Sequence, residues 1–392
     1  MKKYKHFETN AIRNQISRSQ KKEHSVPIFA TSSFVFDSAE EARAVFADEV
    51  DGYYYSRIAN PNSDEFAIKL AQLEGCEQGV ATATGMSANF LALVANLRSG
   101  DHIVSSRSLF SSSHQIITQI LPRWGITHTY VDYNNTEGWE AAIMPTTRLI
   151  FVETPSNPGL DLIDLAFIGK LAKENNCLFV VDNCFATPYI QNPSEYGCDL
   201  ICHSATKFID GQGRALGGAV VGSKEAMEQV HFFSKQTGPS LSPFNAWILS
   251  KSLETLAVRM EKHCSNAFSL AIHLETVEGI KRVKYPFLES HPQYELAKKQ
   301  MRHGGGLVTF ELDGGYERCI RFIDNIEMFS ITPNLGDTRT AITHPASTTH
   351  SKLTDEEQAR VGISKSMIRM SVGLEHIDDI IEDVEKALEK SK

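Results

Sequence analysis

Leu178-Phe179-Val180-Val181-Asp182 is an apolar run that ends in a carboxylate, and it decides how this chain folds. A short apolar run of this kind is typical of a strand buried on both faces of a sheet. A second run, Leu200-Ile201-Cys202, leads into Ser204-Ala205-Thr206-Lys207. Because ligands of parallel sheets bind beyond the carboxyl ends of the strands, Asp182 and Lys207 are expected at a ligand site.

Taken singly, Asp182 is equally well a cap for the next turn, and Lys207 a solvated turn residue. Together they match the needs of pyridoxal phosphate (PLP), which requires an amine to form a Schiff base and an acid to keep the ring nitrogen protonated. Lys207 supplies the amine and Asp182 the acid, while Ser204 and Thr206 supply hydroxyls for the phosphate. We therefore expect a PLP enzyme whose cofactor is bound to Lys207.

Two further segments suit a phosphate group. Thr84-Gly85-Met86-Ser87 opens an amphipathic stretch, and a glycine at a helix start leaves free N–H groups facing an anion. Tyr53-Tyr54-Tyr55-Ser56-Arg57 carries a guanidinium that can hold a phosphate through two hydrogen bonds. The alternatives are a plain helix cap at Thr84 and an aromatic-rich surface turn at residues 53–57.

Strands and helix-like runs alternate between residues 51 and 245, which predicts βαβ units and a mainly parallel sheet. The expected strands are 79–82, 102–105, 127–130, 148–153, 178–182, 200–203 and 219–221, with amphipathic stretches at 86–97, 112–121 and 165–175. We predict an α/β fold with this part as the cofactor-binding domain. Residues 1–50 are expected to form an N-terminal arm with a short helix near 39–46.

The pattern changes after residue 245. A long helical run at 246–278 precedes expected strands at 283–285, 306–312 and 368–371, and a last helix at 376–390. Acidic residues early and lysines late in that helix suit its dipole. Residues 246–392 are therefore predicted to form a smaller α+β domain.

Composition excludes several classes of protein. The formal charge of −9 provides no basic surface for nucleic acid or anionic lipid, and no apolar stretch approaches the ~18 residues of a spanning helix. The seven cysteines are scattered, without a C-x-x-C pair or an apolar leader, so we expect free thiols, a cytoplasmic protein and no metal site. No G-x-G-x-x-G follows a strand, which argues against a nucleotide-dependent oxidoreductase.

Several strings, in order along the chain, resemble the Cys/Met-metabolism PLP enzymes of the transsulfuration group. They are Tyr55-Ser56-Arg57-Ile58-x-Asn60-Pro61, Gly85-Met86, Glu153-Thr154-Pro155-Ser156-Asn157-Pro158, Asp182-Asn183, Ser204–Lys207, Gly217-Gly218, His344-Pro345-Ala346-Ser347 and Arg369-Met370-Ser371-Val372-Gly373-x-Glu375. The resemblance covers residues 10–390. It implies the PLP-dependent transferase fold type I, similar to aspartate aminotransferase, and a homotetramer built from dimers.

The resemblance also implies roles at the matching positions. Lys207 would carry the cofactor and move protons, and Asp182 would hold the ring nitrogen. Asn157 would lie near the phenolic oxygen of the cofactor, and Arg369 would bind the substrate carboxylate through its fork of donors. The phosphate ligands would be Gly85, Met86, Ser204 and Thr206, joined by Tyr55 and Arg57 from a neighbouring subunit.

This sequence departs from the family at two positions of the site. Phe110 replaces the tyrosine that usually stacks on the cofactor ring, so stacking is kept but a phenol for proton transfer is lost. Asn334 stands where many members have serine near the substrate carboxylate. The loss of the phenol argues against a lyase.

The string Phe208-Ile209-Asp210-Gly211-Gln212-Gly213-Arg214 and Phe110 resemble the O-succinylhomoserine sulfhydrylases of this family. We therefore expect γ-replacement on an O-acylhomoserine, with sulfide as nucleophile and homocysteine as product. Cysteine as nucleophile, the acetyl ester, and a γ- or β-lyase are the alternatives, in that order. A non-catalytic relative is disfavoured because Asp182, Lys207 and Arg369 are all present.

Overall fold

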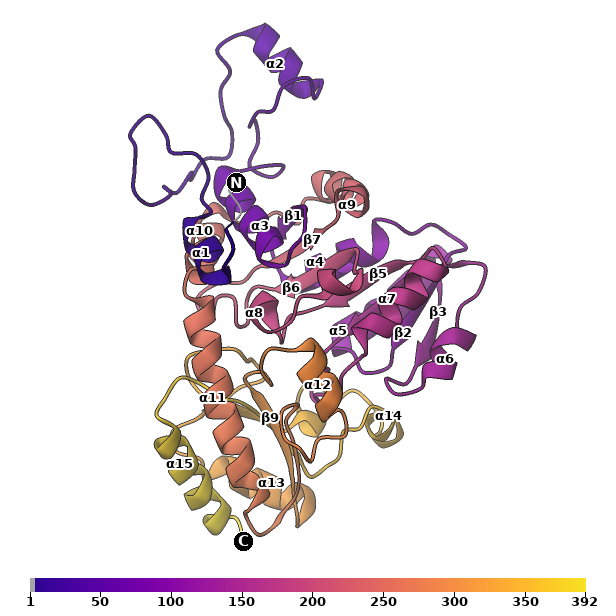
Figure 1. The fold of residues 1–392 in the computed structure, drawn as a ribbon, viewed down its shortest axis with the longest axis vertical. Helices are drawn as coiled ribbons and strands as arrows, with labels where there is room; N and C mark the ends of the chain where they lie inside the picture. The colour runs from indigo at the N-terminus through magenta and orange to yellow at the C-terminus, as the bar shows by residue number, and fades with distance from the viewer. Residues whose placement is uncertain (1–3) are drawn as a thin grey trace.

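A seven-stranded sheet lies at the centre of the larger part of the computed structural model, which describes residues 4–392 (Figure 1). Its strand order is β1-β7-β6-β5-β4-β2-β3. The strands are β1 (Gln78–Thr82), β2 (His102–Ser106), β3 (Thr127–Val131), β4 (Thr147–Glu153), β5 (Leu178–Asp182), β6 (Leu200–Ser204) and β7 (Gly218–Gly222). Neighbours from β6 to β3 pair in parallel, and β7 is antiparallel to both of its neighbours. The predicted mainly parallel sheet and fold class are confirmed.

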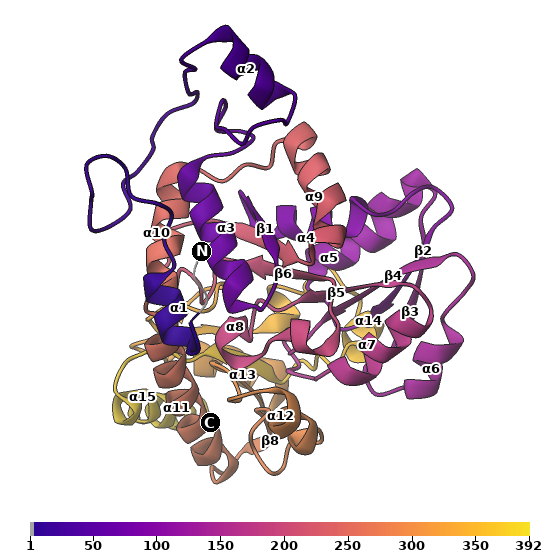
Figure 2. The same ribbon diagram turned by 45° about the horizontal axis from the view of Figure 1, so that its top comes forward.

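The side chains of strand β5 contribute to two buried clusters, one on each face of the sheet. Phe179 and Val181 belong to one buried cluster and Val180 to another, on the opposite face of the sheet. Successive side chains of a strand point to opposite faces, so an uninterrupted apolar run is covered by helices on both sides. The first face packs against α3 (Pro61–Leu73) and α7 (Leu165–Glu174), and the second against α4 (Gly85–Val94) and α9 (Lys224–Thr237) (Figure 2).

The second sheet has the order β10-β11-β12-β9-β8 and lies in the C-terminal part of the chain. Its strands are β8 (Ile280–Lys284), β9 (Leu307–Leu312), β10 (Ser330–Ile331), β11 (Ala341–Thr343) and β12 (Met367–Ser371). Helices α11 (Leu256–Glu275), α13 (Gly315–Asp324) and α15 (Ile377–Lys390) share a buried cluster with it. The three strands expected here are confirmed, whereas β10 and β11 were not foreseen. The domain boundaries at residues 50 and 245 stay a prediction.

The single helical run expected at 246–278 is wrong, because α10 (Pro243–Leu253) ends before α11 begins. At the break, the Ser252 carbonyl oxygen accepts from the backbone N–H of Thr255 at 3.2 Å and from Arg259 Nη2 at 3.0 Å, in place of a regular helical hydrogen bond. Arg259 lies on α11, and the same Nη2 donates to the carbonyl oxygen of Ile209 at 3.0 Å. The stretch expected at 112–121 is also divided, into α5 (Ser111–Gln115), a π-helix (Ile116–Ile120) and a 3₁₀ turn (Leu121–Trp124).

The N-terminal segment contains α1 (Phe7–Arg13) and α2 (Ala39–Phe46). Both views show α2 and the chain around it standing away from the rest of the protein. Large apolar side chains are exposed on this segment, including Val35 at 95% and Phe46 at 65%. Side chains as apolar and as exposed as these are uncommon on the surface of an isolated soluble chain.

The remaining helices connect the two sheets or flank them. They are α6 (Thr136–Ala141), α8 (Thr187–Ile190), α12 (Tyr294–Gln300), α14 (Asp355–Arg360) and two 3₁₀ turns (Pro193–Tyr196 and Pro345–Ser347). Within residues 4–392, no helix is both long and apolar enough to cross a membrane.

Candidate active site

Asp182 is the last residue of β5 and its side chain is 8% exposed. One carboxyl oxygen accepts a hydrogen bond from the Asn89 amide at 2.8 Å, and the other accepts from the backbone N–H of Cys184 at 3.1 Å. Burial raises the pKa of Asp182, and no Lys or Arg of residues 4–392 forms an ion pair with it. A buried acid without a cation fits a partner such as the protonated ring nitrogen of PLP.

Glu153 lies beside Asp182, because it ends β4 and pairs with Asp182 across the two parallel strands. Burial, and then the charge of Asp182, raise the pKa of Glu153 well above its ordinary value. Its Oε2 accepts a hydrogen bond from the backbone N–H of Phe110 at 2.7 Å. Glu153 was not predicted as a site residue, although it too is an acid that ends an apolar run. Its position shows that it holds the backbone of Phe110.

Lys207 lies in the turn that follows β6, the strand next to β5. Its ammonium donates to the side-chain oxygen of Asn334, a residue of the C-terminal part of the chain. Burial lowers the pKa of Lys207, and the positive charge of Arg369 lowers it further, while Cys184 opposes the shift. A lysine that loses its proton more readily than usual suits an amine nucleophile and a base.

An anion-binding cradle forms where α4 begins. The N–H groups of Gly85 and Met86 open the helix and have no acceptor among the described residues, as is usual for the first turn. A side chain on Gly85 would collide with Ser204, so only glycine lets the helix start approach the end of β6. Thr206 exchanges hydrogen bonds with Gly217 through its hydroxyl and its N–H. The four predicted phosphate ligands thus come from two adjoining segments.

Arg369 lies in β12 and is 2% exposed. Its Nη1 donates to the Asn157 amide oxygen at 3.0 Å, and its Nη2 to the carbonyl oxygen of Pro333 at 2.7 Å. Its Nε has no partner, and no carboxylate of residues 4–392 forms an ion pair with it. Burial lowers its pKa to about 10. A buried cation with an unused donor fits a carboxylate brought in by a substrate.

Asn334 connects the two cationic groups. Its side-chain oxygen accepts from Lys207, and its carbonyl oxygen accepts from Arg369 Nη2 at 3.3 Å. The turn behind it needs Gly336, which has φ +76° and packs against the backbone of Phe208. The structure therefore brings Lys207, Asn334, Arg369 and Asn157 together, as one chain of contacts.

Phe110 precedes α5, and its ring has no aromatic partner among the described residues. Tyr55 and Arg57 are not brought to the cradle within this chain. Arg57 Nη1 donates to the carbonyl oxygen of Lys235 at 2.6 Å, and its guanidinium lies over the Tyr55 ring at 5.1 Å. Both residues lie between α2 and α3, and the bond to Lys235 attaches Arg57 to α9.

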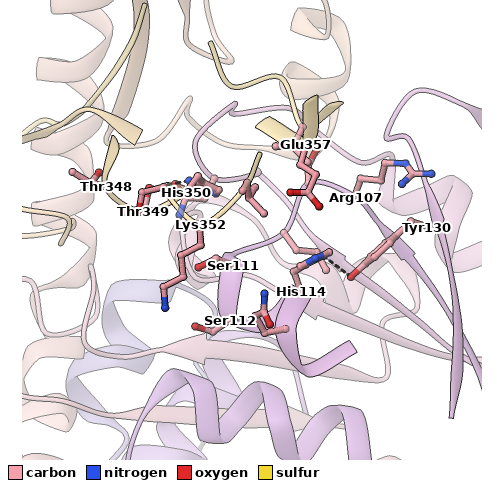
Figure 3. A pocket seen from close by; sticks show the side chains of 17 residues that line it. Arg107, Ser111, Ser112, His114, Tyr130, Thr348, Thr349, His350, Lys352 and Glu357 are labelled. Carbon is pink, nitrogen blue, oxygen red and sulfur yellow. Dashed lines mark hydrogen bonds between the residues drawn. The ribbon is translucent and has the colours of Figure 1, made fainter. Parts of the chain in front are cut away.

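A cavity of about 470 Å³ has Asn157, the amide partner of Arg369, in its lining; we name it the outer cavity (Figure 3). It lies between residues 107–115 and residues 348–361, with Asn157 and Tyr130 completing its walls. Its walls combine apolar side chains (Leu109, Leu353 and Val361) with hydroxyls, two histidines and the charged side chains of Arg107, Lys352 and Glu357. Through Asn157, the outer cavity adjoins the arginine site.

Comparisons with known proteins agree with this geometry. The family model described as Cys/Met metabolism PLP-dependent enzyme matches residues 8–389. An O-succinylhomoserine sulfhydrylase of Pseudomonas aeruginosa is 49% identical over 383 residues, which is 97% of this chain and 95% of that protein. An L-methionine gamma-lyase of Fusobacterium nucleatum is 43% identical and covers 93% of each chain.

A solved structure is similar over nearly the whole chain. It is a putative O-acetylhomoserine (thiol)-lyase from Campylobacter jejuni, which superposes with a TM-score of 0.94 at 35% identity and covers 97% of this chain and 99% of its own. That protein carries N′-pyridoxyl-lysine-5′-monophosphate. The predicted family, its extent along the chain and the predicted cofactor are confirmed.

Proposed function

The chain belongs to the Cys/Met-metabolism family of PLP-dependent enzymes, and from this premise we propose that it catalyses γ-replacement on an O-acylhomoserine. The first choice of substrate is O-succinylhomoserine, with sulfide as nucleophile and homocysteine, a precursor of methionine, as product. The observation that carries the proposal is the contact chain from Lys207 through Asn334 to the buried Arg369. It supports an amino-acid carboxylate held beside a lysine of lowered pKa.

When bound, PLP supplies an electron sink for the charge that develops on the substrate. In this proposal Asp182 holds a proton at the ring nitrogen, and the N–H groups of Gly85 and Met86 bind the phosphate. Arg369 fixes the α-carboxylate of the substrate through two parallel donors, because its fork is already oriented by Asn157 and Pro333.

Lys207 is proposed as the group that moves protons. Its amine takes the proton from the substrate Cα, gives it up, and then takes one from Cβ, which requires a base that is partly neutral near pH 7. The bond between Cγ and the acyl oxygen breaks and succinate leaves. The sulfide anion HS⁻ then forms the new C–S bond at Cγ, and protons return to Cβ and Cα through Lys207 to give homocysteine. The Asn334 amide keeps the Lys207 amine on the substrate side of the site.

A steady-state comparison of succinyl-, acetyl- and phosphohomoserine, each with sulfide, tests this proposal. We expect homocysteine from the succinyl ester at the highest kcat/KM. Replacing sulfide with cysteine distinguishes cystathionine formation, and omitting the nucleophile measures 2-oxobutanoate from elimination. No homocysteine from any of the three esters would refute the proposed function.

The similarity to L-methionine gamma-lyases makes elimination the second candidate function, and Phe110 provides the test. Phe110→Tyr is expected to raise elimination relative to replacement, since positioned acid–base groups contribute about 10²–10⁴-fold. Cofactor affinity should change little because the ring still stacks. Both products are measured for wild type and variant, with Phe268→Tyr on α11 as a control that adds a phenol elsewhere. An unchanged product ratio in Phe110→Tyr would mean that Phe110 merely fills space.

We also propose that the active site is shared between subunits of a homodimer, which pairs into a tetramer. The exposed apolar residues of the N-terminal segment support this, because Val35 and Phe46 lose water contact only against another chain. Tyr55 and Arg57 follow that segment along the chain and would reach the neighbour's cradle. All seven cysteines are free, which supports a cytoplasmic location.

Mixed subunits test the shared site. Arg57→Ala and Lys207→Ala are each expected to have little activity alone. When the two variants are co-expressed in equal amounts, about one quarter of the active sites should regain both residues, because each mixed dimer holds one intact site. Activity assays after separation by two affinity tags measure this. A mixed dimer as inactive as its parents, or a fully active monomer in sedimentation, would refute the shared site.

A further inference from the structure

The outer cavity is larger than the proposed nucleophile needs. Sulfide is a single heavy atom, whereas the cavity holds about 470 Å³. A water molecule has a share of about 30 Å³ in the liquid, so sulfide would leave nearly all of this volume to solvent. The cavity adjoins Asn157, which contacts the arginine expected to hold the substrate carboxylate. A substrate whose α-carboxylate is bound by Arg369 would have room for its acyl leaving group in the outer cavity.

The lining of the outer cavity favours an anionic group at that end. Hydroxyls project from both sides, namely Ser111, Ser112, Thr348 and Thr349. Lys352 lies on the segment of residues 348–361, and its side chain extends towards Ser111 and Ser112 in Figure 3. Among the described residues, no carboxylate forms an ion pair with its ammonium. Its charge is thus available to a ligand.

The other ionisable side chains of the cavity have partners within the protein. Arg107 Nε lies 3.1 Å from the carboxylate of Asp132. His114 shares a hydrogen bond of 3.0 Å with the Tyr130 hydroxyl, and burial lowers its pKa, which favours the neutral ring. The Glu357 carboxylate accepts from the backbone N–H of Thr354 at 2.8 Å, at the start of α14. Glu357 keeps its negative charge, while Lys352 is the cation of the lining that has no carboxylate partner among the described residues.

We infer that the outer cavity is the subsite for the acyl group of the substrate, and that Lys352 binds the terminal carboxylate of a succinyl-type acyl chain. The inference rests on the proposed function and assigns its substrate class, a half ester of a dicarboxylic acid. An acetyl ester has no second carboxylate and gains nothing from Lys352. Because Lys352 is exposed, its contribution is modest and is screened by salt.

The test compares two esters in the holoenzyme. Lys352→Met is expected to lower the ratio of kcat/KM for O-succinylhomoserine over O-acetylhomoserine by about 5- to 10-fold. Lys352→Arg should keep most of the ratio, because the charge remains. Lys262→Met, on the exposed side of α11, serves as a matched control and should leave the ratio unchanged. In wild type, added salt should lower the ratio, and in Lys352→Met it should not.

Binding of succinate, measured by calorimetry, gives a readout that needs no turnover. Wild type is expected to bind succinate more tightly than Lys352→Met does. The inference is overturned if Lys352→Met lowers kcat/KM equally for both esters, or if wild type and Lys352→Met bind succinate equally well. Homocysteine formation by the wild type would still support the proposed function in that case. Conversely, a wild type that makes no homocysteine but binds succinate through Lys352 refutes the proposed function and supports the subsite.

Discussion

Asp182→Asn is expected to lower kcat by at least about a hundredfold while the protein still binds PLP, since removing one preorganised charge from a site of this kind costs about 10²–10³-fold. The amide keeps the shape but has a single accepting oxygen, so it retains only one of the two hydrogen bonds that Asn89 and Cys184 donate, and it cannot hold the ring nitrogen in its protonated form. The loss should appear in kcat more than in KM, because Arg369 still binds the substrate. Cofactor content from the absorbance spectrum and steady-state rates measure both effects.

Asp199→Asn is a matched control for Asp182→Asn. Asp199 directly precedes β6, at the amino end of the strand, where its carboxylate accepts from the backbone N–H of Phe179 at 2.8 Å. The loss of that charge is expected to affect stability but not the chemical step. If Asp182→Asn turned over at a near-normal rate, Asp182 would be a structural cap only.

Lys207→Ala is expected to lower kcat by about 10⁴-fold or more, because one amine both carries the cofactor and moves the protons. Borohydride reduction of the wild-type holoenzyme should leave a pyridoxyl mass on the peptide that contains Lys207. Lys207→Ala should show no such adduct, although its cradle still binds the phosphate of PLP. Lys365→Ala, at an exposed lysine paired with Asp355, is the control.

An adduct on another lysine would overturn the assignment of Lys207. Lys207→Arg separates charge from nucleophilicity. The guanidinium keeps a positive charge beside Asn334 but does not lose its proton at any pH of interest. It should therefore be as inactive as Lys207→Ala, which a purely electrostatic role for Lys207 would not explain.

The local sequence pattern was sufficient to predict the large sheet and the residues at the carboxyl ends of its central strands. The run 178–182 is apolar on both faces, and the structure covers both faces with helices. Asp182 and Lys207 follow neighbouring strands, so the end of a parallel sheet brings them together whatever lies elsewhere in the chain. Each of these features depends on a few consecutive residues, because a short run of apolar side chains by itself predicts a buried strand.

Short or distant features were beyond the reach of local pattern. Strands β10 and β11 have two and three residues, too few for a periodicity to show. At the break between α10 and α11, Arg259 binds the carbonyl oxygen of Ser252 and also those of Phe208 and Ile209. Phe208 and Ile209 lie 51 and 50 residues from Arg259 along the chain, so a local pattern carries no sign of these contacts.

Amino-acid sequence by itself determined the type of fold and the cofactor, and it predicted Asp182, Lys207 and Arg369 as site residues. Tertiary structure decided how they meet: Asn334 lies 127 residues from the lysine it contacts, and Arg369 lies 212 residues from Asn157. It also decided that Glu153 holds the backbone of Phe110 and that Lys352 faces the outer cavity. The reason is that a pattern along the chain encodes which side chains are buried, whereas the partner of a buried or charged group depends on how the two sheets pack.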